Sequence, residues 1–335
     1  MGATTINKLY IEPSSLCNLQ CNICFRNNWI GEKQGLMDEA CFENLYKALA
    51  VSAPANVVLG GMGEPLTHPR IAQWTRKLKS LGCRVEVITN AVLLTEAMSR
   101  ELIDAGIDEV WISMEGFSRE AYEKERRGAA YDDLIRNIEA FNRARGAATD
   151  VMLGVTFVMI AENTRELTRI NRFAQVYKVD EINLSFAIPS SPVERENTIY
   201  RDGYPVGRMR EWAPNFTPVR DTYCRFVAED NAFVRWDGAV APCMQLLHEC
   251  HTYLYTEKRR IRRISFGNVN NSDIHEIWQS DAYTAFRKRI CEFDFPCCTS
   301  CDGCDDRLCN EKDCCYNDFP TCGACLWGRG LVYCP

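Results

Sequence analysis

The sequence predicts an α/β protein: a partial (β/α)6 TIM-type barrel followed by a cysteine-rich C-terminal domain. Short apolar runs alternate with amphipathic stretches through the first 190 residues, and the composition shifts at about residue 223. Eleven of the 19 cysteines in this 335-residue chain lie between Cys291 and Cys334. Strands alternating with helices are typical of parallel βαβ units. Six such units are fewer than the eight of a closed barrel, so the barrel is predicted to be open.

Each predicted element of the first half follows a local pattern. Strands are short apolar or β-branched runs, predicted over residues 8–11, 57–59, 85–89, 109–113, 155–160 and 181–186. Helices have apolar residues spaced three or four positions apart, and are predicted over residues 38–52, 69–81, 95–105, 131–145 and 164–176. We expect residues 1–190 to form the barrel and residues 191–222, rich in Pro, Ser, Arg and Asn, to form a connector.

Residues 223–335 are predicted to form a second domain with few regular elements. A hairpin over residues 232–236 and 239–241 turns at Asp237–Gly238, and one helix is predicted over residues 274–287. Beyond Cys291 there is almost no apolar periodicity. Something other than hydrophobic burial must therefore hold this tail together.

Composition excludes several classes of protein. A net charge of −6 argues against a general nucleic-acid binder. No stretch reaches about 18 apolar residues, which argues against a membrane-spanning helix, and the N-terminus lacks the apolar region of a signal peptide. We therefore expect a cytoplasmic protein that binds neither nucleic acid nor membranes. Cysteines crowded into such a chain are typical of metal ligands rather than disulfides.

Cys17, Cys21 and Cys24 form a CX3CX2C motif directly after the first predicted strand. Three thiolates on one loop can ligate three irons of a [4Fe–4S] cube and leave the fourth iron open. An open position on a metal centre invites a ligand, whereas a structural site is closed. A zinc loop or three unpaired thiols are the alternatives that spacing alone leaves open.

This motif, followed by the aromatic Phe25, resembles that of the radical S-adenosylmethionine (SAM) superfamily. Further motifs follow in the family's order over roughly residues 5–190: a GGE-like turn at 60–64, Thr-Asn at 89–90, a Ser-x-Glu-Gly segment at 113–116 and Arg-Gly at 127–128. Glu115 stands where the family has Asp. The resemblance implies that SAM is contacted by Phe25, Gly61, Gly63, Glu64, Thr89, Asn90, Ser113, Glu115 and Arg126.

The same resemblance implies a radical enzyme. SAM at the open iron would be cleaved by one electron to a 5′-deoxyadenosyl radical, which abstracts a hydrogen atom from the substrate. Reduced ferredoxin or flavodoxin is the electron donor implied. The sequence identifies no catalytic acid or base, and none of the four histidines is assigned a role.

A second cysteine pattern lies in the C-terminal domain. Cys224 and Cys243 form CX13GX4C around Gly238, which resembles the opening of a SPASM domain, an iron–sulfur extension of radical SAM enzymes. The ending, from Asp313 to Pro335, resembles a narrower group: the radical SAM maturases of tungsten-cofactor oxidoreductases, or aldehyde ferredoxin oxidoreductase cofactor-modifying proteins. The implied substrate is a tungsten oxidoreductase or its pterin cofactor.

The SPASM resemblance implies eight further thiolate ligands, enough for two closed [4Fe–4S] clusters and three clusters in all. They are Cys224, Cys243, Cys301, Cys304, Cys314, Cys322, Cys325 and Cys334. One expected set contains Cys224, Cys243 and Cys325 with one more thiol, and the other contains Cys301, Cys304 and Cys334 with one more. Cys41 and Cys83 are expected in the core, and the remaining six are unassigned: Cys250, Cys291, Cys297, Cys298, Cys309 and Cys315. Zinc in one tail site is the main alternative.

Three functions compete at this point. The first is maturation of a tungsten enzyme by radical chemistry, and the second is modification of a ribosomally synthesised peptide, as many SPASM enzymes perform. A separate peptide-recognition domain often precedes the barrel in that second group, whereas here the cysteine motif begins at Cys17. The third is a non-catalytic iron–sulfur or zinc protein, against which the ordered SAM motifs argue.

Overall fold

The computed structural model describes residues 5–146, 150–192, 207–210, 213–215, 223–293, 295–296, 298, 304–312, 314 and 322–328. Ten strands of this part form one sheet, in the order β10-β9-β1-β2-β3-β4-β5-β6-β7-β8. The first six strands pair in parallel and in chain order: β1 (Lys8–Ile11), β2 (Asn56–Leu59), β3 (Arg84–Thr89), β4 (Glu109–Met114), β5 (Met152–Met159) and β6 (Glu181–Phe186). The sheet does not close through these six, which confirms the predicted partial barrel.

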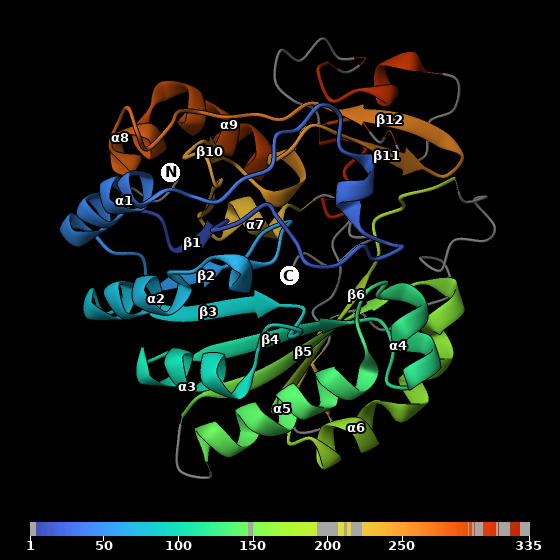
Figure 1. Ribbon diagram of the computed structural model, residues 1–335. Coiled ribbons are helices and arrows are strands. Elements are labelled where there is room, and N and C mark those ends of the chain that lie inside the picture. Colours follow the sequence, from blue (N-terminus) through green and yellow to red (C-terminus); the bar gives the residue numbers. More distant parts are fainter. Residues whose placement is uncertain are drawn as a thin grey trace.

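Helices cover the outer face of this curved sheet (Figure 1). They are α1 (Glu39–Val51), α2 (Ile71–Ser80), α3 (Glu96–Asp104), α4 (Arg119–Glu125), α5 (Tyr131–Arg145) and α6 (Ile170–Val176). Asp38 and Thr95 cap α1 and α3 by accepting hydrogen bonds from backbone N–H groups of the first turn. The apolar faces pack inward, where Phe42 of α1 stacks on Trp74 of α2 with ring centroids 4.1 Å apart.

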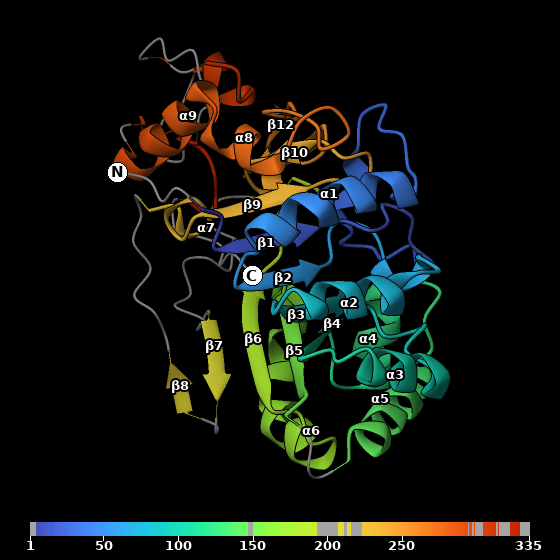
Figure 2. The same ribbon diagram turned by 90° about the vertical axis from the view of Figure 1, so that its left-hand side faces the viewer.

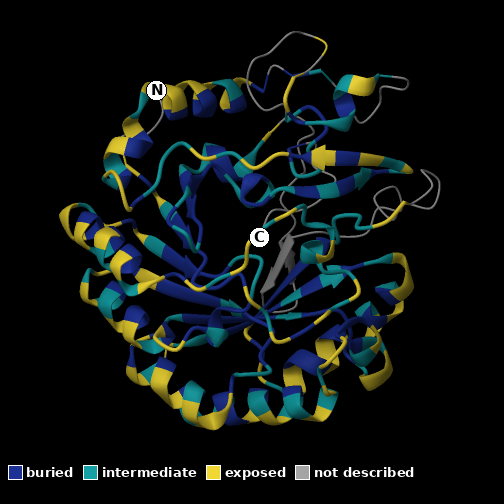
Figure 3. Cartoon of the chain, turned by 45° about the horizontal axis from the view of Figure 1, so that its top comes forward, coloured by how far each residue is buried: buried dark blue, intermediate teal, exposed yellow. Residues whose placement is uncertain are grey.

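The strands are buried while each helix keeps one exposed face (Figure 3). All six residues of β6 are buried, as is almost every residue of β4. Strands covered on both faces read as continuous apolar runs, which is why the sequence shows them clearly. The six strands therefore fix a common edge, at their carboxyl ends, where the loops of the candidate site meet.

The C-terminal part of the chain adds elements at both ends of the sheet. Strand β9 (Asn231–Val234) pairs with β1 in parallel, and β10 (Val240–Ala241) returns antiparallel to it. Figure 2 shows β7 (Gly207–Arg210) and β8 (Ala213–Asn215) at the opposite end, beyond β6. One sheet thus crosses the boundaries predicted at residues 190 and 222, and the domain division itself stays a prediction.

The remaining C-terminal elements lie over the β1 end of the barrel (Figure 1). They are α7 (Arg225–Ala228), the hairpin of β11 (Cys250–Leu254) and β12 (Glu257–Ile261), α8 (Ile274–Gln279) and α9 (Asp281–Glu292). The hairpin turning at Asp237–Gly238 is confirmed. The single helix predicted over residues 274–287 is wrong, because Ser280 ends α8 and caps α9 through the backbone N–H of Tyr283.

Three further differences concern local structure. Residues 161–169 form a 3-10 helix before α6, where one α-helix over residues 164–176 was expected. Two strands, β7 and β8, lie inside the predicted connector. Helix α4 and the β11–β12 hairpin were not predicted. No described helix combines the length and the apolar character needed to cross a membrane.

Candidate functional site

The CX3CX2C motif lies on a loop that leaves the carboxyl end of β1. The backbone N–H of Gln20 donates to the carbonyl of Arg127 at 3.1 Å, and that of Asn22 donates to the carbonyl of Glu125 at 2.9 Å. These bonds tie the loop to the segment after α4. Cys17, Cys21 and Cys24 are all partly exposed. The structure thus brings the loop and the Arg126 segment together, as the resemblance implied.

The three thiols are close enough to influence one another. Burial raises the pKa of Cys17 and that of Cys21, the latter to about 12, and the neighbouring Cys24 sulfur adds to both shifts. Such thiols stay protonated unless a positive centre displaces the proton. The backbone N–H of Leu19 and the side-chain amide of Asn90 face the Cys17 sulfur at 3.4 and 3.7 Å.

Sulfur atoms that accept N–H hydrogen bonds are typical of iron–sulfur ligands. Among the described residues, no three His, Cys, Asp or Glu side chains converge as the ligands of a single metal ion would. A four-iron cube is wider than one ion, so its ligands stand further apart. Three thiols on one loop, within electrostatic reach of one another, have the ligand number of a cluster that leaves one iron open.

The glycine turn after β2 packs directly against this loop. A Cβ atom on Gly63 would lie 2.2 Å from the carbonyl oxygen of Ser14 and 2.6 Å from that of Leu16. A Cβ on Gly61 would lie 2.7 Å from Cγ of Glu12. Only glycine permits this approach, which brings the backbone of the turn up to the cysteine loop.

We expect Gly63→Ala to disrupt this turn, because carbonyl groups of the backbone cannot yield as a flexible side chain can. A displacement of about 1 Å costs about 100-fold in rate, so SAM cleavage should fall by about that factor while the iron content stays unchanged. The measurement is 5′-deoxyadenosine formed per minute by the reconstituted protein.

Gly60→Ala is the matched control, since the nearest atom to its added Cβ is the side-chain Cβ of Ile88 at 3.3 Å. Its loss of activity should be much smaller. Equal losses in the two variants would contradict the importance of the Gly63 contact.

Glu64 joins the glycine turn to the end of β3. Its buried carboxylate accepts hydrogen bonds from the Thr89 hydroxyl and the Asn90 backbone N–H, both at 2.7 Å, and from the Leu66 N–H at 3.0 Å. The Asn90 side-chain amide in turn donates to Asn18 in the cysteine loop at 2.9 Å. The side chain of Glu64 is thus engaged within the protein and positions Thr89 and Asn90 beside the loop.

Glu115 and Arg126 form a buried ion pair at the end of β4. The guanidinium donates from Nε and Nη2 to the two carboxylate oxygens at 2.5 and 2.9 Å, and each side chain is about 5% exposed. The positive charge of Arg126 also lowers the pKa of Cys21, against the larger effect of burial. Glu115, which stands where the family has Asp, is therefore the ion-pair partner of Arg126. Ser113 lies on β4, and Phe25 begins the 3-10 helix after Cys24 and packs against the main core.

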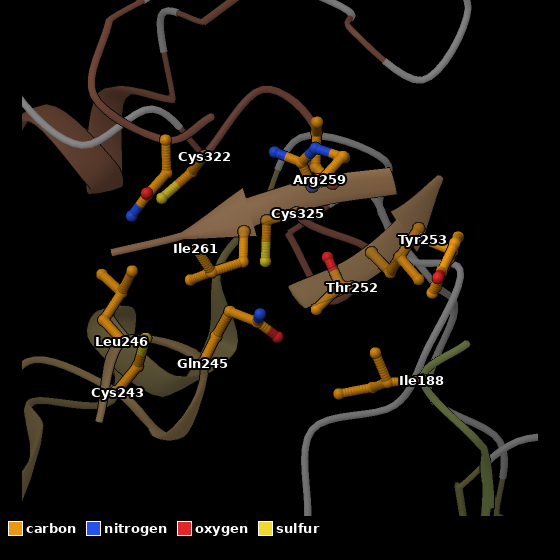
Figure 4. A pocket seen from close by; sticks show the side chains of 13 residues that line it. Ile188, Cys243, Gln245, Leu246, Thr252, Tyr253, Arg259, Ile261, Cys322 and Cys325 are labelled. Atoms are coloured by element: carbon orange, nitrogen blue, oxygen red, sulfur yellow. Dashed lines mark hydrogen bonds between the residues drawn. The ribbon is translucent and has the colours of Figure 1, made fainter. Parts of the chain in front are cut away.

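A second set of thiols converges in the C-terminal part. Burial raises the pKa of Cys224 to about 12 and raises the pKa of Cys243 and Cys322 as well. The mutual proximity of these thiols and Cys325 adds to each shift. Figure 4 shows Cys243, Cys322 and Cys325 around one hollow. Together with Cys224, which acts on them electrostatically, these thiols number four, the ligand number of a closed cube.

The hollow also contains the buried guanidinium of Arg259, on β12. Its Nε donates to the carbonyl of Arg307 at 2.6 Å, and Nη1 donates to that of Ala324 at 3.1 Å. Arg259 thereby ties the Cys322–Cys325 segment to the hairpin. Its charge acts electrostatically on Cys325 and also on Cys298 and Cys309, two cysteines that the sequence left unassigned.

Of the other predicted ligands, two lie in the described part of the chain. Cys304 is partly exposed and Cys314 is exposed. Cys301 and Cys334 lie outside the described residues, as do Cys297 and Cys315. The expected core positions of Cys41 and Cys83 are confirmed, since both are buried.

Sequence reasoning missed one buried polar network beside the glycine turn. It consists of Glu12, Glu32, Arg235, Asp237 and His248, joined by hydrogen bonds. Its members come from four segments of the chain. The two that lie furthest apart, Glu12 and His248, are separated by 236 positions. No local spacing could have revealed them.

Comparison with known proteins supplies independent findings. Residues 11–174 match the radical SAM superfamily, and residues 224–305 match the SPASM family, described as an iron–sulfur cluster-binding domain. The chain is 30% identical to the tungsten-containing aldehyde ferredoxin oxidoreductase cofactor-modifying protein of Pyrococcus furiosus, over 98% of this chain and 96% of that protein. A probable GTP 3′,8-cyclase of Saccharolobus islandicus is 29% identical over 53% of this chain and 56% of its own length.

Solved structures agree with the fold. Native anSMEcpe with bound AdoMet matches with a TM-score of 0.63 at 18% identity, over 95% of this chain and 94% of that one. SuiB of Streptococcus suis bound to S-adenosylmethionine matches with a TM-score of 0.61 at 17% identity, over 89% of this chain and 71% of that one. At these identities the likeness concerns the fold alone.

Proposed function

From the premise that this chain is a radical SAM enzyme with a SPASM iron–sulfur domain, a member of the radical SAM superfamily, we propose that it matures a tungsten pterin cofactor or the aldehyde oxidoreductase that holds it. The observation that supports this most is the end-to-end likeness to the cofactor-modifying protein of Pyrococcus furiosus. That likeness extends past residue 305, where the SPASM match stops, and so includes the cysteine-rich tail.

The proposed SAM site is the edge where the cysteine loop, the glycine turn and the ends of β3 and β4 meet. Cys17, Cys21 and Cys24 would hold a [4Fe–4S] cluster, which when bound supplies the electron that cleaves SAM. The backbone of the Gly61–Gly63 turn offers its polar groups to the methionine part of SAM. The other proposed contacts are Phe25, Glu64, Thr89, Asn90, Ser113, Glu115 and Arg126.

The residues of this chain would bind, orient and shield the reactants. Two contacts make the proposed SAM site rigid. Glu64 holds the end of β3, and the buried charges of Glu115 and Arg126 keep each other in place. In the C-terminal part, Cys224, Cys243, Cys322 and Cys325 are proposed as one auxiliary ligand set. Cys301, Cys304, Cys314 and Cys334 are proposed as the other, for three clusters in all.

The proposal is tested with the anaerobically reconstituted full chain, SAM and a reductant. We expect about twelve irons per chain from three cubes, and formation of 5′-deoxyadenosine. Reduced ferredoxin or flavodoxin should replace the chemical reductant. Addition of a tungsten aldehyde oxidoreductase carrying its pterin cofactor should increase 5′-deoxyadenosine formation, whereas the same oxidoreductase stripped of cofactor or a mixture of peptides should not.

Absence of SAM cleavage by the iron-loaded protein would overturn the proposed activity. Stimulation by peptides and not by the tungsten enzyme would overturn the proposed substrate. About four irons together with stoichiometric zinc would leave the barrel site intact and refute the auxiliary clusters.

A further inference from the structure

A fully buried polar pair outside the proposed SAM contacts joins two residues that lie 236 positions apart in the chain. Glu12 follows β1, His248 follows β10, and both side chains have no exposed surface. The Nε2 atom of His248 lies 3.0 and 3.1 Å from the two carboxylate oxygens of Glu12. Its Nδ1 atom lies 3.3 Å from a carboxylate oxygen of Glu32. Each ring nitrogen therefore faces a carboxylate.

Between two ionised carboxylates, a histidine that donates from both ring nitrogens is an imidazolium, because the neutral ring carries only one N–H. Burial alone lowers the pKa of His248, but its hydrogen bonds to Glu12 and Glu32 raise the pKa above the ordinary value. The ring also stacks on Trp29, with centroids 4.1 Å apart. An aromatic face next to a buried cation is favourable.

Each carboxylate of the network faces at least one cation, which compensates for the loss of water around its buried members. The carboxylate of Glu32 accepts hydrogen bonds from Nη1 of Arg235 at 2.8 Å and from the backbone N–H of Glu249 at 2.9 Å. Arg235 also binds Asp237 through Nε and Nη2, and Arg263 approaches Glu32 at 3.5 Å. Three carboxylates thus face two guanidinium groups and one imidazolium.

The other side of Glu12 contacts the glycine turn. Its Oε1 atom accepts a hydrogen bond from the backbone N–H of Met62 at 3.1 Å, between Gly61 and Gly63, where an added Cβ would clash. The carboxylate that holds Met62 is therefore itself held by a residue 236 positions later in the chain. The turn cannot keep this contact if Glu12 changes its rotamer.

We propose that His248 is a positioning residue for SAM, which acts through Glu12 to hold the Met62 turn in its binding conformation. The inference rests on the proposed SAM site at this turn. It means that the C-terminal part, beyond carrying cluster ligands, completes the binding site in the barrel. His248 touches neither SAM nor a cluster ligand in this role.

The test compares His248→Gln with His251→Gln in the full, reconstituted chain. Glutamine has one amide nitrogen and no positive charge, so it cannot hold both carboxylates as an imidazolium does, and its support of the Glu12 side chain is weaker. His251 lies on β11 and carries no hydrogen bond to the network, which makes it a matched control. We expect the dissociation constant for SAM, measured by anaerobic equilibrium dialysis, to rise about tenfold in His248→Gln. It should stay unchanged in His251→Gln, with equal iron content in both variants.

A second pair of variants decides the matter if His248→Gln loses iron or unfolds. In Glu12→Gln the amide oxygen still accepts from Met62 and the amide nitrogen donates to a neutral His248, so SAM affinity should stay within a few-fold of the wild type. In Glu12→Ala the affinity for SAM should fall about tenfold. In addition, Glu12→Ala combined with His248→Gln should bind no more weakly than Glu12→Ala alone.

Wild-type affinity in His248→Gln at full iron content would overturn the inference, as would equal affinity in Glu12→Gln and Glu12→Ala. These outcomes leave the proposed function standing. Failure of the wild-type protein itself to bind SAM would instead refute the proposed function, and the inference with it.

Discussion

Replacing Cys17, Cys21 and Cys24 together by alanine is expected to reduce 5′-deoxyadenosine formation to the level of a reaction without enzyme. The three residues stand on one loop, and their thiols lie within electrostatic reach of one another. Without them the proposed cluster has no protein ligand, so no electron reaches SAM. Iron per chain should fall by about four atoms, while iron bound in the C-terminal part stays. The measurements are product formation and total iron after anaerobic reconstitution.

Cys83→Ala is the control for this triple variant. Cys83 is a buried cysteine directly before β3, at the end of the barrel away from the cysteine loop. Its replacement removes a thiol of the same kind but no proposed ligand, so both iron content and product formation should remain. Survival of SAM cleavage in the triple variant would show that the CX3CX2C loop does not carry the catalytic cluster.

Replacing Cys322 by alanine is expected to have the second-largest effect, on both iron content and stability. Cys322 lines the C-terminal hollow together with Cys243 and Cys325, and burial raises its pKa well above the ordinary value. The tail around it has little apolar periodicity, so cluster binding supplies folding free energy that packing does not. We expect a loss of about four irons and a fall of about 10 °C in the thermal unfolding midpoint.

Cys291→Ala tests the specificity of that result. Cys291 lies in the last turn of α9, is exposed, and acts electrostatically on Cys224, but it is not a proposed ligand. The Cys291→Ala variant should keep the iron content and the thermal unfolding midpoint of the wild-type protein. If Cys291→Ala lost the cluster and Cys322→Ala kept it, the proposed set of four thiols would be wrong.

The barrel elements were predictable because their signals are local. The bounds of β1, α5 and β6 follow the predicted ranges residue for residue, since a buried parallel strand is a continuous apolar run and α5 repeats its apolar residues at helical spacing. The split between α8 and α9 escaped prediction because Ser280 serves as the end of one helix and the cap of the next. The apolar spacing runs through that break and so conceals it.

The candidate SAM site was predictable only in its components. Parallel strands in chain order bring their carboxyl ends to one edge, so the residues after β2, β3 and β4 had to lie near the cysteine loop. What each side chain does there depends on its partners. Glu64 was expected to contact SAM, and its carboxylate also proves to hold Thr89 and Asn90 in place. The buried pairing of Glu115 with Arg126 likewise needed the fold to be seen.

The sequence by itself determined the class of this protein: an open α/β barrel, a three-cysteine loop after the first strand, and a tail that needs something other than an apolar core. Those properties follow from periodicity and spacing within short segments. The tertiary structure decided which thiols share a site, grouping Cys322 with Cys224, Cys243 and Cys325. It also placed β9 beside β1 and His248 against Glu12. Apart from Cys322 and its near neighbour Cys325, these pairings join residues about 80 to more than 200 positions apart, where only the packing of the whole chain, and no local pattern, selects the partner.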